Sequence, residues 1–104
     1  MTATMTAEQR QHLLIDLLRQ HLLGEISQGA LLKYLRKDML GISQTRYAEL
    51  VGVSRRTLTD IEQDKGSQAQ SIIDKVFKPF GIKSGLAPIQ PHMACYLLVG
   101  KSDQ

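Results

Sequence analysis

Two short segments with helical patterns, separated by a tight turn, constrain this chain more than any other feature of its sequence. Ser43 is suited to cap a helix that runs through Val51, and Ser54 is suited to cap another that runs to about Gln63. Gly52 ends the first segment, because glycine readily takes the left-handed conformation that follows a helix. The sequence therefore predicts two short helices joined by a three-residue turn.

Apolar residues at helical spacing predict further helices at about residues 7–23, 30–39 and 71–81. Thr6 and Gln9 have capping-box spacing in front of the first of these helices. Pro79 lies in the last turn of the third, where it predicts a kink or an early end. An all-α fold class follows.

The helix at residues 7–23 is apolar over more of its circumference than one packing face needs. Two interpretations are open: a central core helix, or a helix that contacts both its own core and a partner subunit. Under the second, the candidate dimerisation residues are Leu13, Leu17 and Leu18.

The sequence changes character after Gly81, where glycine and proline become frequent. Residues 82–87 are a candidate for a short strand, and residues 93–100 for a second strand or an ordered tail. Because a lone short strand has no partner within this chain, it would have to pair with another chain.

Composition excludes several classes of protein. A chain of 104 residues is a single domain by length, and 13 basic against 10 acidic residues permit nucleic acid binding without demanding it. The single cysteine, Cys95, excludes an intramolecular disulfide and a cysteine-based zinc site, and fits a reducing, cytoplasmic compartment. Short apolar runs argue against a membrane span or a secretion signal.

Catalysis, metals and cofactors are not expected. His12 and His21 are nine residues apart and face opposite sides of their helix, and His92 has no companion. Cys95 lacks a neighbouring basic residue to activate it. Glycine-rich phosphate loops, HExxH motifs and paired catalytic carboxylates are absent from the sequence.

The helix after Ser54 has two different sides. On a helical wheel Arg55, Arg56 and Thr59 share a polar arc, while Leu58 and Ile61 lie on the opposite, apolar side. The polar arc carries donors suited to guanine and phosphate, and it starts at the helix N-terminus, which favours anions. Helix hairpins are common in proteins. The polar arc alone therefore fits either an ordinary solvated face or a face that reads DNA.

Residues 40–66 resemble the DNA-binding core of the XRE family, relatives of the lambda and 434 phage repressors. The marks that carry the resemblance are Ser43, Gln44, Ala48, Gly52, Val53, Ser54, Leu58, Ile61 and Glu62. The likeness covers about residues 31–82 and implies a lambda-repressor-like helix-turn-helix bundle that binds double-stranded DNA and regulates transcription. Tyr47 departs from the family pattern, where an aliphatic residue is usual.

The resemblance implies base-reading positions on the second helix of the motif. Arg55 and Arg56 fall where the phage repressors read bases, and Thr59 and Asp60 complete the set. Asp60 is a departure: it either accepts a hydrogen bond from cytosine N4 or restrains Arg56 through an i,i+4 pair. The second interpretation is preferred.

The resemblance also implies contacts to the DNA backbone and one structural pair. Gln44 matches a family glutamine that contacts phosphate and helps to orient the recognition helix. The full set of expected backbone contacts is Gln44, Thr45, Arg46, Ser54, Gln63 and Lys65. Glu62 matches a glutamate that pairs with a basic residue of the preceding helix, here Lys37 or Arg36.

The expected organisation is an N-terminal helical extension at residues 1–29, a DNA-binding domain at 30–82 and a C-terminal segment at 83–104. Residues 76–86 resemble XRE regulators and antitoxins in which a short strand pairs across a dimer, so Ile82 and Leu86 are further candidate dimer contacts. A homodimer would place two recognition helices about 34 Å apart on a palindromic operator. The alternative is a DNA-binding antitoxin that also neutralises a protein toxin.

Overall fold

The computed structural model describes residues 5–99, and within that range it contains helices and no strand, which confirms the all-α class. The helices in chain order are α1 (Ala7–Leu22), α2 (Gln28–Tyr34), the π-helical turn η1 (Leu35–Leu40), α3 (Gln44–Val51), α4 (Arg55–Glu62), α5 (Gln70–Phe77), the 3-10 turn η2 (Lys78–Phe80) and α6 (Pro91–Val99). None of the described helices is long and apolar enough to cross a membrane.

The starts of α1, α3 and α4 lie where the sequence predicts them, because their capping side chains are in place. Thr6 and Gln9 form a reciprocal capping box at the start of α1. The Oγ of Ser43 accepts a hydrogen bond from the backbone N–H of Arg46 at 3.1 Å, and so fixes the start of α3. Gly52 ends α3 with a φ of 77°, a left-handed conformation that favours glycine.

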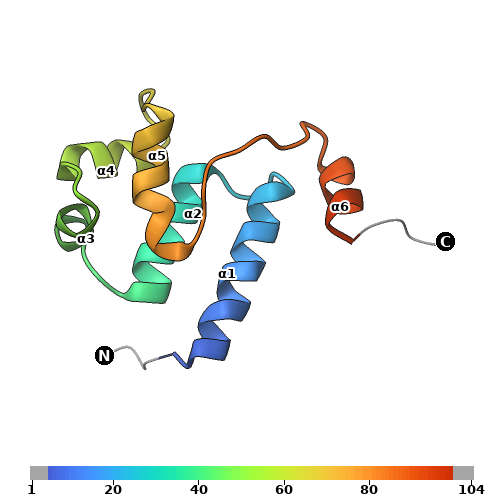
Figure 1. The fold of residues 1–104 in the computed structure, drawn as a ribbon, viewed down its shortest axis with the longest axis horizontal. Helices are drawn as coiled ribbons and strands as arrows, with labels where there is room; N and C mark the ends of the chain where they lie inside the picture. The colour runs from blue at the N-terminus through green and yellow to red at the C-terminus, as the bar shows by residue number, and fades with distance from the viewer. Residues whose placement is uncertain (1–4, 100–104) are drawn as a thin grey trace.

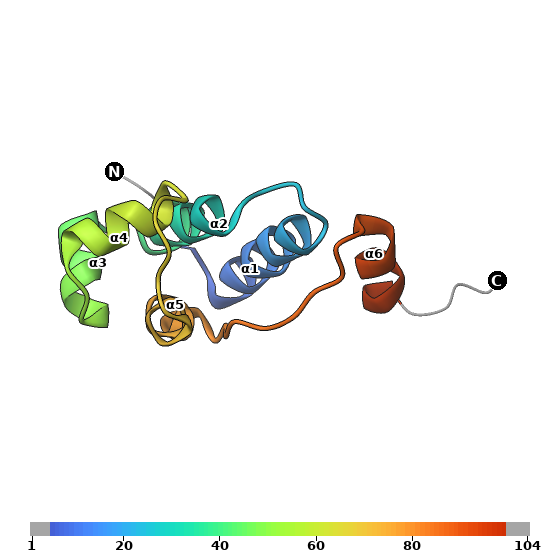
Figure 2. The same cartoon turned by 90° about the horizontal axis from the view of Figure 1, so that it is seen from above.

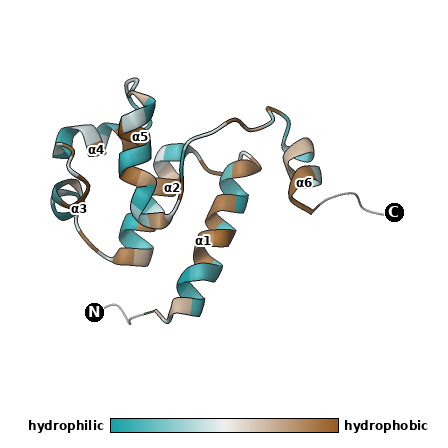
Figure 3. Ribbon diagram, in the orientation of Figure 1, coloured by the Kyte–Doolittle hydropathy of each residue, from teal (hydrophilic) through white to brown (hydrophobic). Residues whose placement is uncertain are grey.

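Helix α2 lies in the middle of the bundle, with α1 on one side and the pair α3 and α4 on the other (Figures 1 and 2). The core between these helices and α5 consists of fully buried apolar side chains. They include Leu32, Leu35, Leu58, Ile61 and Val76. Figure 3 shows that hydrophobic residues alternate with hydrophilic ones along α1 and α5, so each helix has a buried and a solvated side.

Helix α1 is a core helix, the first of the two interpretations that its sequence allowed. Leu17 is buried, and Leu13 and Leu18 are partly buried against the same core. The protomer's own core covers Leu17, whereas Leu13 and Leu18 keep part of their surface; a role of the three leucines in a dimer stays a prediction. Ile15 is the exposed apolar residue of this helix.

The C-terminal segment differs from the expectation. A strand at residues 93–100 is wrong, since Pro91–Val99 forms α6; Gly100 lies outside the described residues. Proline is favourable at the first position of a helix, and Met93, Ala94 and the leucines that follow are good helix formers.

Residues 82–87 form neither helix nor strand in the described chain. The N–H and the hydroxyl of Ser84 both donate to Oδ1 of Asp74, each at 2.7 Å, and so fix this segment against α5. The Ser84 N–H, and after it the hydroxyl, hold the pKa of the Asp74 carboxyl below its usual value. A strand needs a paired neighbour. Pairing of residues 82–87 across a dimer stays a prediction.

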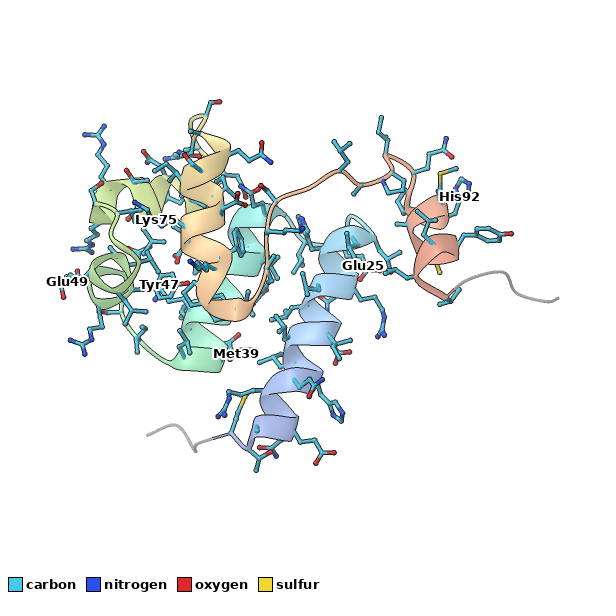
Figure 4. The ribbon with its side chains drawn as sticks, in the orientation of Figure 1. Glu25, Met39, Tyr47, Glu49, Lys75 and His92 are labelled. Carbon is cyan, nitrogen blue, oxygen red and sulfur yellow. The ribbon has the colours of Figure 1, made fainter. Side chains whose placement is uncertain are left out.

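Tyr47 shows why an aromatic residue replaces the aliphatic one that the family pattern favours. Its side chain is fully buried between α3 and α5 (Figure 4), and its ring stacks on Phe80 with the centroids 5.9 Å apart. The phenol donates a hydrogen bond of 2.6 Å to the carbonyl of Val76, so its polar end is satisfied. Burial, and then the charge of Glu62, raise the pKa of Tyr47 far above its usual value.

We predict that Tyr47→Phe lowers the free energy of unfolding by about 1–3 kcal/mol at pH 7, because it removes the donor to a buried carbonyl. Urea denaturation followed by circular dichroism measures this loss. Tyr34→Phe is the matched control, since Tyr34 is 44% exposed, and it should leave the stability unchanged.

The difference in the free energy of unfolding between the parent and Tyr47→Phe should shrink above about pH 10. Tyrosine in the unfolded chain loses its proton near that pH, whereas the native state keeps Tyr47 neutral, so the unfolded state binds fewer protons. The stability of the parent therefore falls as the pH rises through this range. A difference that stays constant up to pH 11 would contradict the prediction.

Candidate nucleic-acid interface

Helix α4 holds its two arginines outside the core by burying its other side. Leu58 and Ile61 are 0% and 1% exposed, whereas Arg55 and Arg56 are exposed in the first turn of the helix. The hydroxyl of Ser54 accepts from the N–H of Thr57 at 3.0 Å and caps the helix. The N–H groups of Arg55 and Arg56 lie in the first turn, where a helix favours an anion.

A buried ion pair fixes the far end of α4. The guanidinium of Arg36 donates from Nε to Oε2 of Glu62 at 2.6 Å and from a terminal nitrogen to Oε1 at 2.9 Å. The two side chains are 7% and 2% exposed. This confirms that Glu62 pairs with a basic residue of the preceding helix, and it selects Arg36 over Lys37, which is exposed.

Arg36 also reaches the loop between η1 and α3. Its remaining terminal nitrogen donates to the carbonyl of Ile42 at 2.8 Å. The one guanidinium therefore joins the start of the helix-turn-helix to the end of its second helix. A lysine could not make these three directed bonds, because only the planar guanidinium presents its donors as a fixed fork.

Gln44 connects the ion pair to the outer face of α4. Its Nε2 donates to Oε1 of Glu62 at 2.9 Å, and its Oε1 accepts from the hydroxyl of Thr59 at 3.2 Å. A carboxylate only accepts, so the amide nitrogen must face Glu62 and the amide oxygen must face Thr59. One N–H of the amide is left for another partner.

The bond to Gln44 changes which part of Thr59 is expected to contact DNA. Its hydroxyl is already used by Gln44, so its methyl group is the part that remains for a base. Sequence reasoning did not foresee this bond, because Gln44 and Thr59 are 15 positions apart.

Asp60 does not restrain Arg56 in this structure. The ion pairs found within residues 5–99 join Arg19 to Asp16 and Arg36 to Glu62, and neither includes Asp60. The i,i+4 pair preferred from the sequence is therefore not formed. Arg56 is exposed and Asp60 is partly exposed, so both side chains are accessible from solvent.

A second anchor joins the end of α4 to the start of α2. Asp64 takes a φ of 57°, and its carboxylate accepts from the N–H of Gly29 at 2.9 Å and from the hydroxyl of Ser27 at 2.6 Å. A Cβ added at Gly29 would lie 2.4 Å from the carbonyl oxygen of Ile61, so only glycine fits this close approach. The feature of the sequence that could have indicated this anchor is Asp64 itself, which stands just after α4 where a helix usually ends in glycine.

The other expected backbone contacts lie at the edges of the motif. Thr45 and Arg46 are exposed in the first turn of α3, and Gln63 and Lys65 are exposed beyond α4. Gln44 is partly buried by its bonds to Glu62 and Thr59. No group of three His, Cys, Asp or Glu side chains within residues 5–99 is arranged to hold a metal.

A family model described as helix-turn-helix matches residues 32–85. The HTH-type transcriptional regulator PuuR of Escherichia coli (strain K12) is 39% identical over 57 residues, which make up 55% of this chain and 30% of that protein. PuuR of Shigella flexneri matches with the same figures. The matched stretch thus covers less than a third of the curated relatives. No solved structure matches the chain significantly.

We predict that Glu62→Ala lowers the free energy of unfolding by about 3–5 kcal/mol, because it leaves the Arg36 guanidinium buried without a counter-charge. Denaturant unfolding measures the loss. Glu49→Ala is the control, since Glu49 lies on the outer side of α3 (Figure 4) and should change the stability by less than about 0.5 kcal/mol.

The double variant Arg36→Met with Glu62→Leu should recover most of this stability, because an apolar pair of similar size carries no uncompensated charge. If the double variant is less stable than Glu62→Ala, the loss does not come from an unpaired charge.

Proposed function

Because the chain belongs to the XRE family of DNA-binding helix-turn-helix transcriptional regulators, we propose that it binds a palindromic operator as a homodimer. Helix α4 lies in the major groove and reads bases, and α3 crosses the backbone. The observation that carries this proposal is the bond network around Glu62, which fixes α4 while leaving its arginines free.

The proposed base contacts follow from the exposed chemistry of α4. Arg55 and Arg56 each donate in bidentate fashion to O6 and N7 of guanine, and the Thr59 methyl contacts a thymine methyl. Asp60 accepts from the N4 amino group of a cytosine, since Arg56 does not neutralise it in the free protein. This predicts a half-site with neighbouring G·C pairs.

The proposed backbone contacts surround these side chains. The unused N–H of Gln44 donates to a phosphate, so one amide both orients α4 and fixes the register on the duplex. Further phosphate contacts come from exposed residues at the starts of α3 and α4 and beyond the end of α4. They are Thr45, Arg46, Ser54, Gln63 and Lys65.

We predict that Arg55→Ala combined with Arg56→Ala weakens operator binding by at least about 30-fold, because each bidentate contact is worth roughly 1–3 kcal/mol. The operator is first selected from a random DNA library, and affinity is then measured by fluorescence anisotropy. The matched control is Arg10→Ala with Arg19→Ala, which removes the same charge from exposed positions on α1. Equal losses of operator affinity in both double variants would exclude base reading by α4.

Lys65→Ala should weaken binding to all DNA sequences by a similar factor. Each lost phosphate contact reduces the slope of log K against log salt concentration by about 1. Salt titrations of the parent and the variant on the selected operator and on an unrelated duplex measure both effects. A variant that changes sequence preference while keeping its salt slope would assign Lys65 to base reading.

A further inference from the structure

The last part of the described chain leaves a large apolar surface without a partner. Seven large hydrophobic side chains between residues 86 and 99 are at least half exposed. They are Leu86, Ile89, Met93, Tyr96, Leu97, Leu98 and Val99. We call residues 88–99 the C-terminal arm, because Leu86 and Ala87 line the groove described below. Its helix α6 contains no Asp, Glu, Lys or Arg, and His92 is its one basic side chain, so it offers little charge to DNA or to an acidic partner.

The arm projects from the bundle. Helix α6 lies apart from the other helices in both views, and its end is hydrophobic in Figure 3. Ala94 is the buried residue of this helix. The radius of gyration is 14.8 Å, whereas a compact domain of this length has about 13 Å. Monomeric proteins rarely leave so many neighbouring apolar side chains in water.

An apolar groove of about 240 Å³ lies between α1, α5 and residues 82–87. Leu18 and Leu22 line it from α1, and Ile73 and Phe77 line it from α5. Its volume is below the roughly 300–1,000 Å³ of small-molecule sites, but it exceeds the roughly 150 Å³ that accommodates a benzene ring. Side chains from one or two turns of a helix match this size and chemistry.

The arm of the same protomer is poorly placed to fill this groove. Residues 82–87 themselves form one wall, and two hydrogen bonds from Ser84 to Asp74 hold them there. Ala87 and Gln90 each precede a proline, which favours an extended backbone at both positions. The connection therefore favours an extended course that leaves the groove after Ala87 and reaches Pro91, which lies beside Gly24 at the end of α1.

We propose that the C-terminal arm of one protomer docks in the groove of a second copy, and that two protomers exchange arms symmetrically. Each chain supplies a mainly apolar arm and a mainly apolar groove, so the contact is self-complementary, as a two-fold dimer requires.

Reciprocal docking also reaches the necessary size. The exposed apolar residues of the arm from Ile89 to Val99 and the lining of the groove together approach the roughly 20 residues a side of a standard interface. The inference rests on the proposed function, because it supplies the homodimer that a palindromic operator needs.

The first test measures the oligomeric state of the full chain by sedimentation equilibrium. We expect the parent to dimerise and Leu97→Glu to raise the dimer dissociation constant at least tenfold. Leu50→Glu is the matched control, because Leu50 on α3 is 59% exposed and Leu97 is 67% exposed. Circular dichroism verifies that both variants keep their helices. Dimerisation of Leu97→Glu with the affinity of the parent would overturn the proposal.

The second test uses the native Cys95, which is exposed on α6. Gly85 lies in the groove wall and has open space for a side chain, so Gly85→Cys introduces a second thiol there. Mild oxidation by oxidised glutathione should give a disulfide-linked dimer that adding Cys95→Ser abolishes and that the parent does not form. A link within one chain, or a linked dimer that needs only one of the two cysteines, would overturn arm exchange.

Operator binding separates failure of this inference from failure of the proposed function. A monomeric chain that still needs Arg55 and Arg56 to bind DNA overturns arm exchange alone. An arm-dependent dimer that binds no DNA overturns the proposed function alone. A monomer whose arm is covered by a different protein, such as a toxin, also overturns arm exchange.

Discussion

The buried ion pair between Arg36 and Glu62 determines where the recognition helix lies. It joins η1 to the last residue of α4, and through Gln44 it reaches the first residue of α3 and the outer side of α4. A buried ion pair contributes little net stability compared with apolar side chains of the same size. Its contribution here is geometric, because two short helices can slide or rotate on an apolar core, whereas directed bonds allow one orientation.

Two further contacts support the same geometry from other sides. Asp64 and Gly29 hold the end of α4 against the start of α2, and Tyr47 joins α3 to α5 through its bond to Val76. Within the described residues, no buried side-chain nitrogen or oxygen is left without a hydrogen-bond partner. The arginines at the opposite end of α4 keep their freedom, so rigid support and an adaptable reading surface lie on the same eight-residue helix.

The two ends of the chain have different roles in this arrangement. Helix α1 covers the bundle with Leu17 and its neighbours, whereas the C-terminal arm turns its apolar side chains toward water. The sequence-based prediction had placed dimer contacts on both. Hydrophobic spacing shows that a helix has an apolar face, but only the structure shows how much of that face its own chain covers.

Local chemistry determined the helix starts, the turn and the division of α4 into two sides. Ser43, Ser54 and Gly52 act within a few residues of themselves, so their effects can be read directly from the order of residues. The choice of Arg36 over Lys37, the bond between Thr59 and Gln44 and the unpaired state of Asp60 were decided only by the tertiary structure. The first two depend on distances between residues far apart in the chain, which packing fixes, and the third depends on the side-chain conformations that Arg56 and Asp60 adopt on α4. The same holds for α6, where β-strand and helix patterns cannot be distinguished in a short apolar run without its surroundings.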